Sequence, residues 1–92
     1  MAVTVRIPAP LRRVTQGKAL VELNCSSLSE CIAELDAQFP GIKERLTDES
    51  GELRSFVNVY LNGEDIRFLK GLNTALKSGD EVSIVPAVAG GY

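Results

Sequence analysis

The chain has 92 residues, of which 45% are hydrophobic and 24% charged, a composition typical of one ordinary globular domain. The net charge of −2, with basic residues scattered along the chain, argues against a nucleic-acid or membrane-surface footprint. No apolar run approaches membrane-spanning length and the first residues lack the order of a signal peptide, so we expect a cytoplasmic protein with no membrane or nucleic-acid partner.

The first quarter of the chain predicts a β-hairpin. Residues 2–7 and 19–24 alternate between apolar and polar side chains, as half-buried strands do. Pro8 and Pro10 end the first strand because proline cannot donate a ladder hydrogen bond. Two such strands with a short connection predict a hairpin. Its apolar face comprises Val3, Val5, Ile7, Val21 and Leu23.

A helix is predicted to begin at Ser27 and to end at Pro40-Gly41. Ser27 and Glu30 have the spacing of a capping box, in which each side chain accepts from an otherwise free amide. A further turn over 42–46 precedes the polar segment 47–52, which we interpret as a mobile surface loop. The buried stripe is Leu28, Ile32, Leu35 and Phe39, and the water-facing side chains are Glu30, Glu34 and Asp36.

The strongest strand signal covers 56–61, where three apolar residues alternate with Phe56, Asn58 and Tyr60. Asn62-Gly63 then supplies the two positive-φ positions of a tight hairpin turn. Beyond it the pattern predicts a short return strand at 65–68, a helical turn at Leu72 and Leu76, a turn at 78–80 and a last strand at 82–85.

The order strand, strand, helix, strand, strand, strand predicts an α+β domain of the β-grasp, or ubiquitin-like, arrangement. We expect a mixed sheet of about five strands, with the first and last strands central and parallel, and one main helix across one face. Residues 1–86 are assigned to this domain. Residues 87–92 are assigned to a flexible C-terminal diglycine tail.

The tail is small and uncharged. Because glycine has no Cβ, Gly90-Gly91 can enter a channel too narrow for a side chain. An extended chain from Ala87 to Gly91 reaches about 17 Å, enough to enter a buried active site in another protein. The alternative is an ordinary frayed end. The residues predicted to enter the active site of a partner are Ala87, Val88, Ala89, Gly90 and Gly91.

Outside the tail, few residues suggest a catalytic or metal-binding site. There is no histidine, and the adjacent acids Asp48-Glu49 and Asp80-Glu81 are better explained as solvated turn residues than as an acid/base pair. Cys25 and Cys31 are too few for a zinc site, an iron–sulfur cluster or a disulfide framework, so we interpret them as reduced thiols, with Cys31 partly buried. We therefore expect no catalysis and no cofactor or metal bound by this chain.

Four stretches carry a resemblance that covers nearly the whole domain. They are Val5-Arg6-Ile7-Pro8 with Leu11-Arg12, then Gly41–Leu46, Phe56–Phe68 and Val85–Gly91. The chain resembles the ubiquitin-like sulfur carriers, the MoaD/ThiS family of the molybdopterin synthase small subunit and the thiamine sulfur carrier. It is most similar to the CysO-type branch that serves cysteine biosynthesis.

The resemblance implies a protein co-substrate rather than an enzyme. An E1-like enzyme would adenylate the Gly91 carboxylate with ATP, and a sulfur donor would displace AMP to leave a thiocarboxylate. In the cysteine branch the thiocarboxylate attacks an aminoacrylate on the pyridoxal phosphate of a cysteine synthase, and an S-to-N acyl shift follows. A JAB/JAMM-type metalloprotease then releases cysteine. ATP, pyridoxal phosphate and zinc belong to the partner enzymes.

Tyr92 departs from the family pattern because it follows Gly91. We expect the metalloprotease to cleave between Gly91 and Tyr92 before activation; the alternative is an added residue without a role. Phe56, Tyr60 and Val85 form a predicted apolar docking patch, with Arg67 orienting an acidic partner, although scattered apolar residues would look the same. We expect a monomer that forms transient complexes.

Two other functions remain open. Within the same family, the carrier could deliver sulfur for molybdopterin or thiamine thiazole synthesis, or modify protein lysines as a ubiquitin-like modifier. In a different class, the chain would be a non-catalytic β-grasp interaction module with an inert tail.

Overall fold

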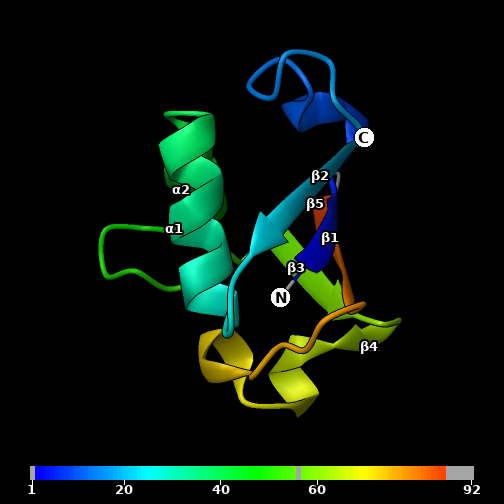
Figure 1. The fold of residues 1–92 in the computed structure, drawn as a ribbon. Helices are drawn as coiled ribbons and strands as arrows, with labels where there is room; N and C mark the ends of the chain where they lie inside the picture. The colour runs from blue at the N-terminus through cyan, green and yellow to red at the C-terminus, as the bar shows by residue number, and fades with distance from the viewer. Residues whose placement is uncertain (1, 56, 87–92) are drawn as a thin grey trace.

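The computed structural model describes residues 2–55 and 57–86, which form a five-stranded mixed sheet with a helix across one face (Figure 1). In spatial order the strands are β2 (Leu20–Asn24), β1 (Ala2–Arg6), β5 (Glu81–Pro86), β3 (Val57–Leu61) and β4 (Glu64–Asp65). β1 and β5 pair in parallel at the centre, and the other neighbours are antiparallel. The predicted β-grasp fold, with its first and last strands central and parallel, is confirmed.

The β1–β2 hairpin follows from the alternation of its side chains. Val5 lies opposite Val21, and Val3 lies opposite Leu23, so the buried residues of the two strands share one face. A single core fills the space between this face and the helices, as two packed layers require. Its members come from every strand except the two-residue β4 and include Val3, Val5, Ile7, Leu28, Leu35, Ile42, Leu46, Val57, Val59, Val82 and Ile84.

Helix α1 (Leu28–Gln38) begins at the N-cap predicted for it. Ser27 Oγ accepts a hydrogen bond from the Glu30 amide at 3.3 Å, which is one half of the predicted capping box. The other half is wrong by one residue, because Glu30 Oε1 accepts from the backbone amide of Ser26 at 2.7 Å. The Ser26 hydroxyl donates to the same oxygen at 3.2 Å, and this second donor favours the shifted bond.

Asp36, predicted to face water, does so only in part. Its side chain is half-buried, and Oδ1 accepts from the amides of Gly41 and Lys43, both at 3.1 Å. Gly41 has φ +103°, a conformation that favours glycine, and it directs the chain into α2 (Ile42–Leu46). Asp36 therefore fixes the start of α2 against the end of α1, and the predicted extra turn over 42–46 is confirmed.

The segment 47–52, predicted as a surface loop, is a hydrogen-bonded turn with a buried first residue. Thr47 is buried and its hydroxyl donates to the Lys43 carbonyl at 2.8 Å. Asp48 Oδ1 accepts from the amides of Ser50 and Glu52, and Thr47 forms an isolated bridge with Leu53. Side-chain caps of this kind give a polar segment a defined conformation.

The return strand after the Asn62-Gly63 turn is shorter than predicted. Asn62 and Gly63 have φ values of +51° and +89°, which confirms the turn. Only Glu64–Asp65 then pairs with β3, because Asp65 Oδ1 accepts from the Arg67 amide at 2.9 Å and caps a 3₁₀ turn, η2 (Ile66–Phe68). Two further 3₁₀ turns are η1 (Ala9–Leu11), which was not predicted, and η3 (Gly71–Asn73). Leu76, predicted for a helical turn, is buried beyond η3.

Within the described part of the chain, every helix is too short or too polar to cross a lipid bilayer.

Candidate functional site

The candidate site is the carboxyl end of β5, where the predicted tail begins. Pro86, the last described residue, pairs with Val57 of β3, and Val85 lies opposite Asn58. β5 pairs with β1 over residues 81–83 and with β3 as far as Pro86, so β3 holds the last described residue in place. Gly91, the predicted adenylation site, Tyr92 and the rest of the predicted tail from Ala87 lie outside the described residues.

Three of the four predicted docking residues lie around this point. Val85 is 44% exposed and Tyr60 half-buried, and both lie on the sheet face opposite α1, on neighbouring strands. Arg67 is exposed, and its Nη2 donates to the carbonyl of Val57, the residue that pairs with Pro86, at 3.2 Å. We call Tyr60, Val85 and Arg67 the tail-root surface. Phe56, the fourth predicted docking residue, lies outside the described residues.

Three large exposed apolar residues, Leu20, Phe68 and Leu69, were not among the predicted docking residues. Leu20 is 53% exposed and lies on the outer face of β2, on the same side as Glu22, opposite Arg6 of β1. The alternation of β2 could have identified it, because Leu20 shares the parity of Glu22. Phe68 is 83% exposed in η2, and its exposure follows from the 3₁₀ turn that replaces the predicted strand.

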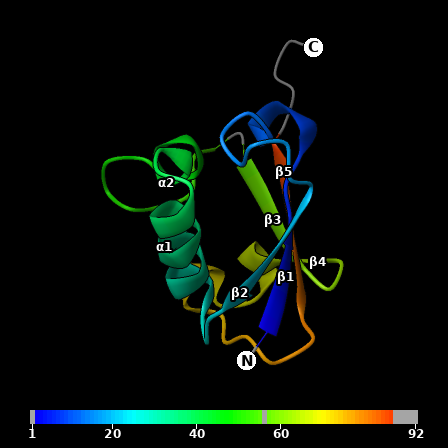
Figure 2. The ribbon, with the colours of Figure 1, turned by 45° about the horizontal axis from the view of Figure 1, so that its top comes forward.

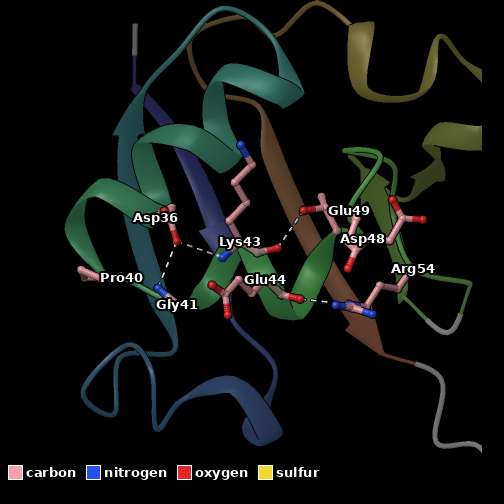
Figure 3. A pocket seen from close by; sticks show the side chains of 9 residues that line it. Asp36, Pro40, Gly41, Lys43, Glu44, Asp48, Glu49 and Arg54 are labelled. Atoms are coloured by element: carbon pink, nitrogen blue, oxygen red, sulfur yellow. Dashed lines mark hydrogen bonds between the residues drawn. The ribbon is translucent and has the colours of Figure 1, made fainter.

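A hollow of about 730 Å³ lies between the end of α1, α2 and the turn after it (Figure 3). Figure 3 shows that its polar groups hold the backbone together: Asp36 bonds the amides of Gly41 and Lys43, and Arg54 Nε donates to the Glu44 carbonyl at 2.9 Å. Asp48 also lines it, and the Ser50 hydroxyl that donates to its carboxylate lowers the pKa of Asp48. These groups serve the fold and form no acid/base pair.

The two thiols are buried in the core. Cys25 and Cys31 are free, and Cys31 is 2% exposed, so the prediction of partial burial is wrong for Cys31. Burial disfavours the charged thiolate and so raises the pKa of both groups, and the negative charge of Glu30 acts in the same direction. Cys31 faces inward because it follows Leu28 by three residues on the buried side of α1.

The buried Cys31 thiol predicts a loss of stability at alkaline pH. Its pKa is raised in the folded state, so the thiol ionises first in the unfolded chain, and this group's contribution is complete below the unfolded pKa of about 8.5. As the pH rises above that value, the free energy of unfolding should fall by up to about 1.4 kcal/mol per pH unit for this thiol. Urea unfolding between pH 7 and 9.5 measures the slope. The Cys31→Ala variant should show a shallower slope, and equal slopes would contradict the prediction.

Across the described ranges, no three His, Cys, Asp or Glu side chains are grouped so that they could hold a metal ion. The described part of the site is therefore the end of a paired strand, β5, beside a partly apolar surface.

Comparisons with known proteins point to one family. A sequence profile described as the ThiS family matches residues 5–91. The chain is 50% identical to a protein of Mycobacterium tuberculosis named sulfur carrier protein CysO, over 99% of this chain and all of that one. It is also 36% identical to small archaeal modifier protein 3 of Haloferax volcanii, again over 99% of this chain and all of that one.

A solved structure is also similar to this chain. The crystal structure of the Amycolatopsis orientalis BexX/CysO complex contains a chain with a TM-score of 0.92 and 47% identity. The match covers 98% of this chain and all of that one. These relatives are carriers and modifiers rather than enzymes, which confirms the expectation that the chain is not itself a catalyst.

Proposed function

Because this chain belongs to the ThiS family, we propose that it is a sulfur carrier protein whose Gly91 carboxylate is converted to a thiocarboxylate. The observation that carries the proposal is the full-length similarity to sulfur carrier protein CysO, at 50% identity. The fold supports it because the central strand β5 ends next to an exposed surface and gives the tail a rigid base.

The chemistry proposed for Gly91 has two steps. A carboxylate is a poor electrophile, so an E1-like enzyme first transfers AMP from ATP to the Gly91 carboxylate and releases pyrophosphate. A sulfide donor then attacks the acyl carbon, the bond to AMP breaks, and Gly91 is left with one sulfur in place of one oxygen. The activating groups belong to the partner, and this chain supplies the acyl group and its reach of about 17 Å.

We propose that the sulfur goes to cysteine. The named CysO relatives favour this route, in which a pyridoxal-phosphate cysteine synthase uses the thiocarboxylate and a JAB/JAMM-type metalloprotease releases the product. The complex of CysO with BexX indicates that a CysO-type carrier also docks with another protein. The tail-root surface of Tyr60, Val85 and Arg67 is the proposed contact for such partners.

A second candidate is protein modification. The similarity to small archaeal modifier protein 3 favours it, because the same activated Gly91 carbonyl could be transferred to a lysine amine. In both functions any residue after Gly91 has to be removed first. We propose that a metalloprotease cleaves the Gly91–Tyr92 bond for this purpose.

The proposed function predicts two changes of mass. After incubation with a lysate of the host, ATP and a sulfide source, the purified chain should lose one tyrosine and then exchange one oxygen for sulfur, as measured by intact-mass spectrometry. A version that ends at Gly91 should need only the exchange. If that version gains no sulfur in an active lysate, the carrier function is wrong. Attachment of the chain to lysines of other proteins, without thiocarboxylate, would favour the modifier.

A further inference from the structure

Three arginines from distant parts of the sequence surround one groove. A hollow of about 590 Å³ lies between the loop that follows η1 and the α2 region, and Glu44 is its only carboxylate. An adjoining hollow of about 470 Å³ shares Arg13, Val14 and Arg45 with it. The lining of the first hollow comprises Arg13, Val14, Gln16, Pro40, Gly41, Glu44, Arg45 and Arg54. We call it the arginine groove.

The walls of the arginine groove are held in place by the fold. Thr15, two residues after Arg13, is buried, and its hydroxyl donates to the Lys18 carbonyl at 2.9 Å, which closes the loop. Across the groove, the Arg54 amide donates to the Leu46 carbonyl at 3.0 Å, and Arg54 Nε donates to the Glu44 carbonyl. The positive charges are therefore presented from anchored backbone.

The groove lies at the same end of the molecule as the candidate site. Figure 2 shows the loop after β1, α2 and the end of β5 together at the top of the fold. Hydrogen bonds connect them: the Arg54 carbonyl accepts from the Val57 amide at 2.9 Å, and Val57 pairs with Pro86. A partner that receives the tail beyond Pro86 would therefore lie within reach of the groove.

The charge of the groove contrasts with that of the chain. Within this lining, three arginines against Glu44 leave a surplus of two positive charges, whereas the whole chain has a net charge of −2. The neighbouring hollow of Figure 3 shares Glu44 and Arg54 and adds three carboxylates beside Arg54, so the unbalanced positive charge is that of Arg13 and Arg45. Arg13 and Arg45 are exposed, and among residues 2–55 and 57–86 the salt bridge that forms is Arg6–Glu81, at 3.0 Å. The two guanidinium groups thus remain available for an outside carboxylate, which they can bind with two parallel hydrogen bonds.

We propose that the arginine groove docks an acidic surface segment of the enzyme that activates Gly91. This inference rests on the proposed function. Long, exposed guanidinium groups in an open groove suit a protein segment carrying Asp or Glu, since no buried side-chain N or O atom among the described residues is left without a partner to hold a small anion. Contact at the groove and insertion of the tail would occur together, so the groove would orient the carrier and raise its rate of association.

The test compares charge reversals in one reaction. The Arg13→Glu/Arg45→Glu variant and ¹⁵N-labelled wild type, each with and without Tyr92, are mixed in host lysate with ATP and sulfide. Intact-mass spectrometry gives the ratio of their thiocarboxylates, which at equal starting concentrations and low conversion equals the ratio of kcat/KM. We expect the variant to be loaded about tenfold more slowly than wild type at low salt. Added salt should slow the loading of the variant less than that of wild type.

A matched control reverses two cations elsewhere. Lys70→Glu/Lys77→Glu makes the same change in net charge, but neither residue lines the arginine groove or the adjoining hollow, so loading should stay within about twofold. If the double reversal proves unfolded by circular dichroism, Arg13→Gln/Arg45→Gln replaces it with a smaller expected loss. Equal loading of variant and wild type would show that the arginine groove does not dock the activating enzyme. If the wild type itself is not loaded, the proposed carrier function is wrong instead.

Discussion

Leu35→Ala should lower the free energy of unfolding by about 3 kcal/mol, since replacing a buried leucine by alanine costs roughly 2–5 kcal/mol. Leu35 is 1% exposed in the middle of α1 and faces the sheet. The void that it lines is only about 10 Å³, so the removed side chain would leave a cavity in a closely packed core. Alanine is a better helix former than leucine, so the loss would come from packing.

Urea unfolding monitored by circular dichroism measures this change, and the slope with urea should be unchanged. Glu34→Ala is the matched control, because the Glu34 side chain is exposed on the same helix. This substitution should change the free energy of unfolding by less than about 0.5 kcal/mol. A loss below about 1 kcal/mol for Leu35→Ala would mean that α1 packs on the sheet less tightly than the structure indicates.

The sequence predicted the sheet well because its signals are local. Alternation separates the two faces of a strand, and Val57 and Val59, two of the three apolar residues that alternate with Asn58 and Tyr60, are both buried. The turn at Asn62-Gly63 depends on the backbone freedom of two adjacent residues, which their identities reveal directly. The order of the secondary-structure elements and the types of the turns between them then leave few possible topologies for a chain of this length.

The errors arose where a side chain bonds to a distant backbone group. Asp36 reaches seven residues ahead to the Lys43 amide, and no periodic pattern of the helix contains that information. Asp65 shortens the return strand because its carboxylate competes for the backbone of Arg67. Such bonds depend on the three-dimensional path of the chain, so hydrophobic periodicity alone misplaces these residues.

The candidate site also has a part that the sequence reveals and a part that only the fold reveals. Small residues and glycines identify the tail, and the resemblance to sulfur carriers gives it a chemical role. The arginine groove could not be recognised, because Arg13, Arg45 and Arg54 look scattered until the fold places η1's loop beside α2. A functional surface made by residues 41 positions apart has no signature in a local window of sequence.

Gly91→Val should reduce thiocarboxylate formation by at least about 100-fold, because misplacing a reacting group by about 1 Å can cost that much. A β-branched side chain restricts the backbone at the reacting carbonyl and adds bulk where we propose that the tail enters a narrow channel. Gly91→Ala, with one methyl group, should lose less. Both variants end at residue 91, so that proteolytic trimming does not affect the comparison, and intact mass measures their loading against ¹⁵N-labelled wild type.

The same variants separate a loss of chemistry from a loss of folding. The described sheet ends at Pro86, five residues before Gly91, so the urea midpoint of Gly91→Val should match that of wild type. Unchanged stability with abolished loading would place the defect at the reacting end of the chain. Normal loading of Gly91→Val would show that the partner does not require glycine there, and the proposed role of the diglycine tail would then be wrong.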